Sequence, residues 1–431
     1  MVRKPEYLKI SGGLITAAFL GIFISMGKPG ALASFFGLLI LPILILFCPQ
    51  VIFFILAIRP FLEKIINTTQ IGLPINLGGI ANLTLIVMAI LCLGLLDKKR
   101  RIKLYFLEYL LFLFAIFICA QIYTSFNRHT TFRELFRFMA MIAIYFLSDF
   151  FISDKKSYVK YGNVFIVSAF IPLFFGFYQL FMGHGNLFVR GFDRVFAVFR
   201  HPNEYAFYLL FLTPLLFNLI QLDSKRKIYY FIMSGLILFS LFKTYTRSAW
   251  IGFVIFVLII AFRKYKIRTL VVLVPLIASL MMIGPIQNRI MEHGNSVKPT
   301  SYTWRLNYWR KLWPEAQTIL LGKGLGTSKS YIELKYYREN DIHNDYIRFL
   351  YEAGWVGTII YWFFWIALAW NTFWWTLKDK KYSFQALTLM ALILNFMFCS
   401  FFDNLQVCIA SLWLLYFQAG AFRGLQSSDA E

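Results

Sequence analysis

The sequence predicts an all-α polytopic membrane protein with about 12–14 transmembrane helices and one large external loop. Of its 431 residues, 59% are hydrophobic and only 15% are charged, whereas a soluble domain carries about 25% charged residues. Apolar runs close to the roughly 20 residues that a helix needs to cross a bilayer recur along the whole chain. Basic residues gather in alternate loops between these runs, as expected for a protein with many spans.

The candidate spans, in chain order, are residues 8–26, 31–47, 51–66, 75–96, 104–123, 132–152, 161–182, 204–222, 228–243, 248–262, 268–284, 345–377, 383–402 and 404–422. The second and third runs form either two helices or one bent helix, because Pro42 and Pro49 interrupt them. No small-residue cleavage site follows the first run, so we expect a helix there and not a signal peptide. We expect disorder in the tail from Gln426 onward.

The basic loops set the orientation. Five clusters alternate along the chain, at 98–103, 155–160, 225–227, 263–268 and 378–381. Their side is cytoplasmic by the positive-inside rule, and both termini lie on it. The opposite loops are then external, and only residues 285–343 form a long one. We therefore expect one integral domain in three parts: a bundle at 1–284, the external loop at 285–343, and further helices with a short cytoplasmic tail at 344–431.

Several classes of function are disfavoured. The formal net charge is +22, but the basic residues lie in short loops where topology and anionic lipid explain them, so we expect no nucleic-acid partner. The five cysteines lie in apolar runs without CxxC spacing and are expected to be packing residues. Histidines are scattered and external carboxylates are not paired by spacing, so we expect no metal and no other cofactor.

The most informative feature is a second set of basic residues on the external side. Positive charge there opposes the orientation rule and needs a reason. The reason we favour is an anionic substrate. The set comprises Arg190, Arg194, Arg200, Arg247, Arg305, Arg310 and His343.

Two short segments carry part of this set. Asn203 precedes an apolar run and is a candidate N-cap. Either Arg200 and Asn203 face a polar cavity, or this segment is only a loop and a helix start. Arg247 lies between two apolar runs with almost no loop around it. It either snorkels to the interface or faces inward to bind phosphate, for which its planar fork is suited.

The long external loop carries the remainder. Trp304, Tyr308 and Leu312 share one face at helical spacing, which predicts an amphipathic helix on the external surface. Gly322, Gly324 and Gly326 do not match a nucleotide-binding loop. Their amides either cradle an anion or a sugar, or form a plain tight turn, which is the commoner case.

The loop ends with His343, Asn344 and Asp345 at the mouth of a helix. A neutral imidazole is the natural general base at external pH. In the run that follows, Gly354 and Gly357 would allow another helix or an acceptor chain to approach closely.

These segments resemble the O-antigen ligase and polymerase superfamily. The resemblance rests on the turn at 246–250, the loop start at 301–305, the glycine run, and His343-Asn344 leading into the two later glycines, all in the family's order. His201-Pro202-Asn203 is similar to the family's earlier external motif. The similarity covers roughly residues 190–360.

The resemblance implies a mostly helical, C-type membrane glycosyltransferase in the bacterial inner membrane, with its active site on the external or periplasmic face. Such enzymes take a glycan from undecaprenyl diphosphate and pass it to an acceptor hydroxyl, without a divalent metal. The acceptor is lipid A core in ligases, the growing polysaccharide in polymerases, or a protein serine in related enzymes. The family's two functional arginines correspond to Arg247 and Arg305, and its loop-end histidine corresponds to His343.

We therefore expect His343 to accept the acceptor's proton while Arg247 and Arg305 neutralise the leaving diphosphate, with inversion at the anomeric centre. The rival interpretation is a lipid-linked oligosaccharide flippase or transporter. Internal repeats are missing, and interior charges are few, with Asp403 merely interrupting the last two runs. The residues expected to bind substrate are Arg190, Arg194, Arg200, Asn203, Arg310, Gly322, Gly324, Gly326, Asn344 and Asp345.

Overall fold

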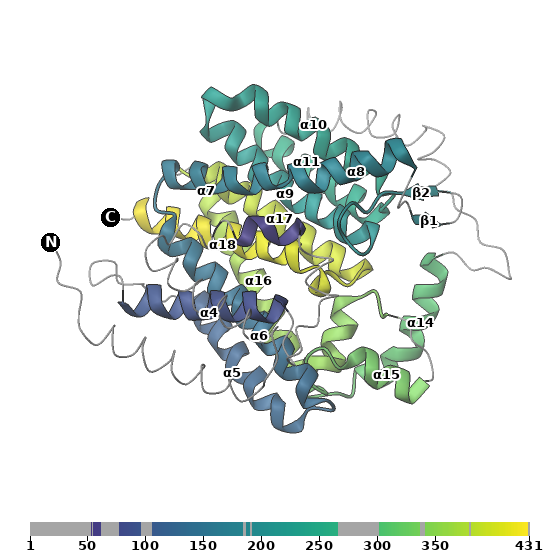
Figure 1. Cartoon of the computed structure of the whole chain (residues 1–431). Helices are drawn as coiled ribbons and strands as arrows, with labels where there is room; N and C mark the ends of the chain where they lie inside the picture. Colours follow the sequence, from purple (N-terminus) through teal and green to yellow (C-terminus); the bar gives the residue numbers. More distant parts are fainter. Residues whose placement is uncertain are drawn as a thin grey trace, which may run out of the picture.

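A computed structural model of the chain describes residues 53–61 (except 54), 77–95, 106–183, 187–189, 192–265, 301–336, 341–378 and 381–429. The predicted spans at 8–26, 31–47 and 268–284 lie outside the described residues, as does Arg190. The described part is helical nearly throughout (Figure 1). Its strands are a short antiparallel hairpin, β1 (Leu187–Val189) with β2 (Phe192–Arg194).

The helices follow the apolar runs closely. Before the long loop they are α4 (Leu77–Leu95), α5 (Phe106–Thr124), α6 (Arg128–Phe151), α7 (Lys155–Ser168), α8 (Phe170–Met182), α9 (Pro202–Leu222), α10 (Lys227–Lys243) and α11 (Arg247–Tyr265). After it come α14 (Ser301–Ala316), α15 (Ser328–Tyr336), α16 (Asp345–Leu377), α17 (Ser383–Phe402) and α18 (Ile409–Asp429). Two 3-10 turns, η1 (Ser224–Arg226) and η2 (Leu405–Val407), complete the described elements.

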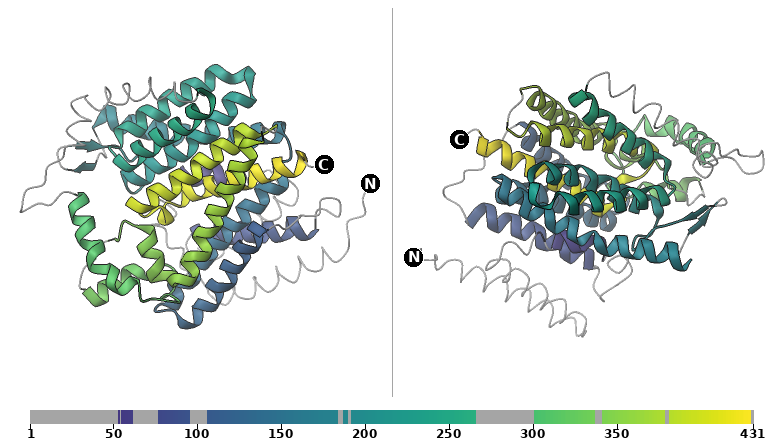
Figure 2. Two further views of the ribbon diagram at one scale, coloured as in Figure 1. Left: turned by 180° about the vertical axis from the view of Figure 1, so that it is seen from behind. Right: turned by 90° about the horizontal axis from the view of Figure 1, so that it is seen from above.

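Among the described residues, five helical segments are long and apolar enough to cross a membrane. They are α5, α7 with α8, α9, α16 and α17. The chain is thus a helical membrane protein, as predicted. Figures 1 and 2 show α18 between two groups of helices, α4–α6 on one side and α7–α11 on the other. The shorter α14 and α15 lie together at one end of this bundle.

Two boundaries differ from the prediction. The run at 161–182 begins earlier, at Lys155, because Asp154 caps α7 by accepting a 2.8 Å hydrogen bond from the Ser157 amide. Its helix is interrupted at Ala169, ahead of Pro172. The last run also shifts along the chain, since 404–408 turns through η2 and α18 begins only at Ile409.

The described part of the tail expected to be disordered, residues 426–429, is helical instead. Helix α18 continues to Asp429, and Gln426 donates a 3.0 Å hydrogen bond to Asn371 of α16. Within α18, Gly420 and Gly424 meet α6 and its C-cap closely: a Cβ would lie 2.0 Å from the Tyr145 carbonyl oxygen at Gly420 and 2.0 Å from the Ile152 carbonyl oxygen at Gly424. The small residues therefore let α18 pack centrally.

Helix α16 is interrupted at Gly354, where φ is +64° and ψ is −174°. The interruption frees the carbonyls of Tyr351 and Glu352, which accept hydrogen bonds of 2.8 and 2.9 Å from the amides of Lys323 and Gly324. In return, the amides of Trp355 and Val356 donate to the carbonyls of Ile319 and Leu320 at 3.0 and 3.2 Å. The glycine-containing segment thus replaces the partners that the broken helix lacks.

The loop helices have a small core of their own, formed with the start of α16. Leu312, Ala316 and Ile332 are buried there, and Tyr308 is nearly so. The apolar face predicted from the helical spacing is therefore confirmed. Glu315 ties the three helices together, because it accepts hydrogen bonds from Tyr331, Tyr336 and Tyr351 at 2.8, 2.9 and 3.1 Å.

Candidate functional site

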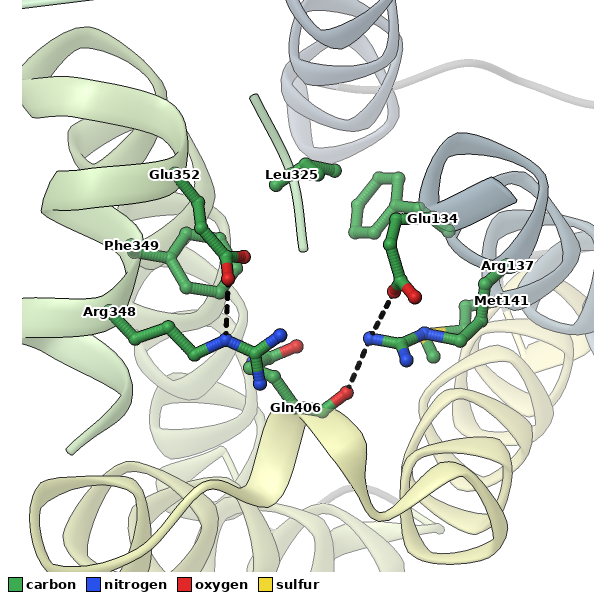
Figure 3. A pocket seen from close by; sticks show the side chains of 9 residues that line it. Glu134, Arg137, Met141, Leu325, Arg348, Phe349, Glu352 and Gln406 are labelled. Atoms are coloured by element: carbon green, nitrogen blue, oxygen red, sulfur yellow. Dashed lines mark hydrogen bonds and ion pairs between the residues drawn. The ribbon is translucent and has the colours of Figure 1, made fainter. Parts of the chain in front are cut away.

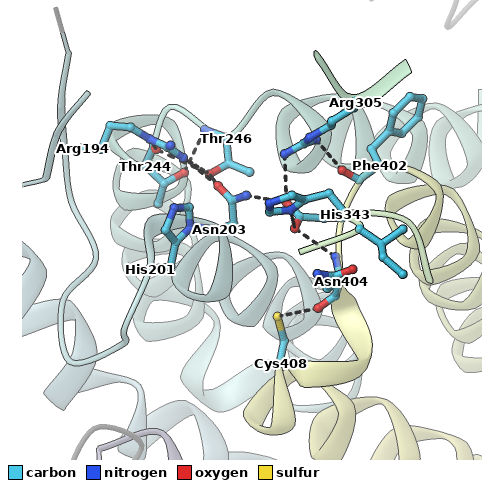
Figure 4. Close-up of polar contacts among 12 residues, drawn as sticks. Arg194, His201, Asn203, Thr244, Thr246, Arg305, His343, Phe402, Asn404 and Cys408 are labelled. Carbon is cyan, nitrogen blue, oxygen red and sulfur yellow. Dashed lines mark hydrogen bonds and ion pairs between the residues drawn. The ribbon is translucent and has the colours of Figure 1, made fainter. Parts of the chain in front are cut away.

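The site is built around Asp403, a buried carboxylate just after α17 (Figure 4). Its Oδ1 lies 3.0 Å from His343 Nδ1 and accepts a 2.9 Å hydrogen bond from the Asn404 amide. Its Oδ2 accepts a hydrogen bond from the Asn203 side chain and lies 4.0 Å from Arg305 Nη2. Asp403 thus joins residues from three distant parts of the chain.

His343 is held from several directions. Its backbone is left-handed, with φ of +50°. The preceding residue is anchored because Trp309 donates a 2.7 Å hydrogen bond to the Ile342 carbonyl. Asn344 follows as the N-cap of α16, accepting 3.0 Å from the Ile347 amide. The imidazole keeps 29% of its side-chain surface exposed, so it is both fixed and accessible.

Arg305 approaches from α14. Its Nη1 donates to the Phe402 carbonyl at the end of α17. The neighbouring Trp304 ring lies 6.1 Å from the His343 ring at an angle of 76°. One turn of α14 therefore places a cation and an aromatic ring beside the histidine.

The other side of the site is formed by Arg194, Asn203 and Thr246. Arg194 is buried, and its Nε donates to the Thr244 carbonyl at 2.8 Å. Its Nη2 donates to Asn203 Oδ1 at 2.7 Å and to Thr246 Oγ1 at 3.1 Å. This guanidinium joins β2 to the start of α9 and to the turn before α11 (Figure 4).

The N-cap predicted at Asn203 is wrong by two residues. His201 is the cap, because its Nδ1 accepts a 3.1 Å hydrogen bond from the Asn203 amide, and Pro202 takes the first helical position. Burial, with a smaller contribution from the nearby Arg194 charge, lowers the pKa of His201 to about 4. His201 is therefore neutral at ordinary pH and is used as a cap.

The charge state of Asp403 follows from its partners. Burial by itself would raise its pKa, but the hydrogen bonds to His343 and from the Asn404 amide, together with the charge of Arg305, hold that pKa well below the usual range. Asp403 is therefore an ionised carboxylate inside the protein.

Several predicted residues lie elsewhere or have other partners. Arg200 is largely exposed and pairs with Glu204 at 3.0 Å. Arg310 is exposed on α14. Asn344 is buried as a cap, as described above, and Asp345 is fully buried, accepting a 3.2 Å hydrogen bond from the Gln406 amide. Asn344 thus caps α16, and Asp345 contacts the backbone of η2.

Arg247 is the first residue of α11, directly after Thr246, which donates to Asn203 Oδ1 at 3.2 Å. The chain therefore brings Arg247 next to the group around Asp403.

The glycines of the run at 322–326 lie elsewhere, against α16, α6 and the residues just before α6. A Cβ at Gly322 would lie 2.3 Å from the Glu352 carbonyl oxygen, and one at Gly324 would lie 2.2 Å from Ser125 Oγ. Of the two alternatives for this run, the tight turn describes the geometry.

Residues 232–362 match the family model described as O-Antigen ligase. This match confirms the resemblance to the O-antigen ligase and polymerase superfamily over that segment. No curated protein matches it. O-antigen ligases are glycosyltransferases of surface polysaccharide assembly. The match therefore supports the general prediction of a membrane glycosyltransferase. Arg247, Arg305 and His343 all lie within the matched region, whereas Asn203 and Asp403 lie outside it.

Asp403 is the residue that sequence reasoning missed. It was regarded only as a charge interrupting two apolar runs. The available signal was its position, since an ionisable residue at the end of a membrane span is costly unless it has a partner and a use. Its partner His343 is 60 residues away along the chain, a separation that no local pattern reports.

Next to this site lies a cavity of about 20 Å³, room for one or two water molecules (Figure 3). Two ion pairs line it: Arg137 with Glu134 at 2.7 Å on α6, and Arg348 with Glu352 at 2.8 Å on α16. Arg137 also donates 2.7 Å to the Gln406 carbonyl. Arg137 thereby anchors the turn that follows Asp403. Among the described residues, no group of three or more metal-ligand side chains is present.

Proposed function

We propose that this protein transfers a glycan from undecaprenyl diphosphate to an acceptor hydroxyl, with inversion and without a metal. The observation that carries the proposal is a partly exposed histidine, held by a buried carboxylate that Arg305 also approaches. The acceptor is lipid A core for a ligase, or the growing polysaccharide for a polymerase.

His343 is the proposed general base. Its Nδ1 faces Asp403, so Nε2 is the nitrogen left for the acceptor. The acceptor oxygen forms a bond to the anomeric carbon while that carbon's bond to the diphosphate oxygen breaks. The hydroxyl proton passes to Nε2, and the leaving diphosphate takes the electron pair of the broken bond. Attack from the face opposite the diphosphate inverts the anomeric centre.

Arg305 and Arg247 are proposed to stabilise the leaving diphosphate. Arg305 donates to the Phe402 carbonyl through Nη1 and approaches Asp403 through Nη2, and a guanidinium has five N–H donors in a planar fork. The donors left over suit a phosphate oxygen. Fixed donors count most where charge develops in the transition state. The contact with the Phe402 carbonyl supports this role, because it fixes the guanidinium before substrate binds.

The same proposal places the protein in the bacterial inner membrane as a C-type fold, with both termini cytoplasmic and the three-part layout 1–284, 285–343 and 344–431. Support comes from the helix ends. The site gathers the starts of α9, α11 and α16 and the end of α17. The basic clusters at 225–227 and 378–381 lie at the opposite ends of those helices. The site would therefore face outward.

The test is turnover by the purified protein in detergent with EDTA present. An undecaprenyl diphosphate-linked glycan is the donor, and lipid A core or a second lipid-linked repeat is the acceptor. We expect release of undecaprenyl diphosphate, and the acceptor that works distinguishes a ligase from a polymerase.

Two histidine variants test whether His343 is the general base. His343→Ala should lower the rate of release about 100- to 10,000-fold, which is what a general base contributes. His129→Ala, at a histidine exposed at the start of α6, should not change it. Normal turnover by His343→Ala would remove the base assignment. Donor binding without turnover by the wild-type protein would favour a flippase instead.

A further inference from the structure

We propose that Arg194 and Asn203 are positioning residues, which fix the Asp403 carboxylate so that it holds the Nδ1 proton of His343. This inference rests on the proposed function, because it concerns how the proposed base is kept in its working tautomer. It also gives Arg194 and Asn203 a role other than the substrate contact that the sequence suggested.

The four side chains form a continuous chain of polar contacts (Figure 4). Arg194 Nη2 donates to Asn203 Oδ1 at 2.7 Å. Asn203 Nδ2 donates to Asp403 Oδ2, and Asp403 Oδ1 lies 3.0 Å from His343 Nδ1. These contacts connect the hairpin strand β2 to the start of α9, then to the end of α17, and finally to the end of the external loop.

Hydrogen-bond chemistry sets its direction. A guanidinium can only donate, so the atom of Asn203 that faces Arg194 must be the carbonyl oxygen. Thr246 also donates to that oxygen, at 3.2 Å. The amide nitrogen must then face Asp403, whose ionised carboxylate can only accept.

The same hydrogen-bond argument determines which ring nitrogen of His343 is protonated. Asp403 Oδ1 already accepts from the Asn404 amide at 2.9 Å. As an acceptor, it requires the facing His343 Nδ1 to carry a proton. The neutral imidazole therefore has its free lone pair on Nε2, the nitrogen proposed to take the hydroxyl proton. Without the fixed carboxylate, both neutral tautomers would be populated.

Arg194 is poorly placed to bind a substrate anion. Only 6% of its surface is exposed. Its Nε donates to the Thr244 carbonyl and its Nη2 donates to both Asn203 and Thr246. A buried guanidinium with these protein partners orients its neighbours, whereas Arg305 keeps 20% of its side chain exposed beside the histidine.

The first experiment measures the tautomer directly. Nitrogen-15 NMR of the histidine-labelled full chain, at a pH where imidazole is neutral, resolves protonated from unprotonated ring nitrogens. The chain has five histidines, so His343→Ala assigns the signal. We expect a protonated Nδ1 in the wild type. Asn203→Leu and Arg194→Lys should shift His343 toward the Nε2-protonated form, and an unchanged spectrum in both would overturn the inference.

A matched control is available on the same helix. Asn218 is buried. Like Asn203, it has both ends of its amide bonded, donating 2.8 Å to Tyr158 and accepting 2.8 Å from Thr388. Asn218→Leu should therefore cost comparable stability, but it should leave the His343 signal where it is. A shift of equal size in Asn218→Leu would mean that the tautomer follows general destabilisation and would contradict the proposal.

The second experiment is a double-mutant cycle on turnover. We expect Asn203→Leu to lower kcat about tenfold or more, part of the 100- to 10,000-fold that a general base contributes, with the KM for donor unchanged. In a His343→Ala background the same substitution should cost nothing further, because residues acting as a unit are not additive. Equal losses in both backgrounds would refute the proposal. If His343→Ala keeps normal turnover, the base assignment fails, and if the wild type binds donor without turnover, the proposed function fails; in both cases the NMR result still decides the positioning role.

Discussion

Gly354→Ala should undock the segment 319–324 from helix α16. The glycine has φ of +64° and ψ of −174°, a conformation nearly restricted to glycine. A Cβ there would lie 2.2 Å from the Leu320 carbonyl oxygen and 2.5 Å from the Gly322 amide nitrogen. Both neighbours are backbone atoms, which cannot move aside like a flexible side chain. The alanine methyl group can be accommodated only if the segment separates.

The cost follows from the bonds that separation breaks. Four backbone hydrogen bonds join the segment to α16, two in each direction, at 2.8 to 3.2 Å. Each contributes about 0.5–1.5 kcal/mol, so their loss lowers the free energy of unfolding by about 2–6 kcal/mol. The carbonyls of Tyr351 and Glu352 would also lose the partners that compensate for the broken helix.

Thermal unfolding of the purified protein in detergent measures this effect, with Gly235→Ala as the control. Gly235 lies in α10, and a Cβ there meets no atom within 4 Å. Alanine at Gly235 should therefore be neutral or stabilise by up to about 1 kcal/mol. A Gly354→Ala protein that melts with the wild type would refute the argument that the broken helix requires glycine.

Three further predictions concern the site and the bundle. Arg247→Lys should transfer glycan poorly and Arg247→Ala should lose most activity, because lysine keeps the charge but loses the planar fork; near-normal kcat/KM for the lysine variant would contradict phosphate binding. The pKa of His201 is about 4 in the folded protein, against an ordinary value of 6.5. Its contribution to the free energy of unfolding is therefore complete above pH 6.5 and falls by up to about 3 kcal/mol as the pH drops toward 4. His201→Asn, which also caps helices, should flatten the melting temperature over that window, and an unchanged pH slope would exclude His201 as its source. Gly420→Leu should lower the melting temperature by several degrees, since a Cβ would lie 2.0 Å from the Tyr145 carbonyl oxygen; equal melting with the wild type would show that α18 can move away from α6.

Some of the site was predictable because its signals are local. The loop-end histidine and the arginine beside a tight turn stand out in the sequence, since charge on the outer side of a membrane protein needs an explanation. Their mutual arrangement was not predictable. Asn203, His343 and Asp403 meet although about 60 to 200 residues separate them in the chain, and Asp403 alone carries no motif.

The glycine run illustrates the same limit. The sequence left open whether Gly322 and Gly324 cradle a substrate or form a plain tight turn, and their φ values of +81° and +103° fit a tight turn. What the turn contacts depends on Gly354, 30 residues later, where α16 breaks. Backbone groups released by one element must find partners in another, and only the folded chain decides which.

The sequence by itself determined the helices. The runs at 345–377 and 383–402 begin and end where α16 and α17 do, because a membrane helix satisfies its own backbone and needs only a long apolar segment. Tertiary structure alone decided which buried carboxylate holds which histidine. That choice depends on where separate helices end relative to one another, and the contacts that set those positions lie far apart in the sequence.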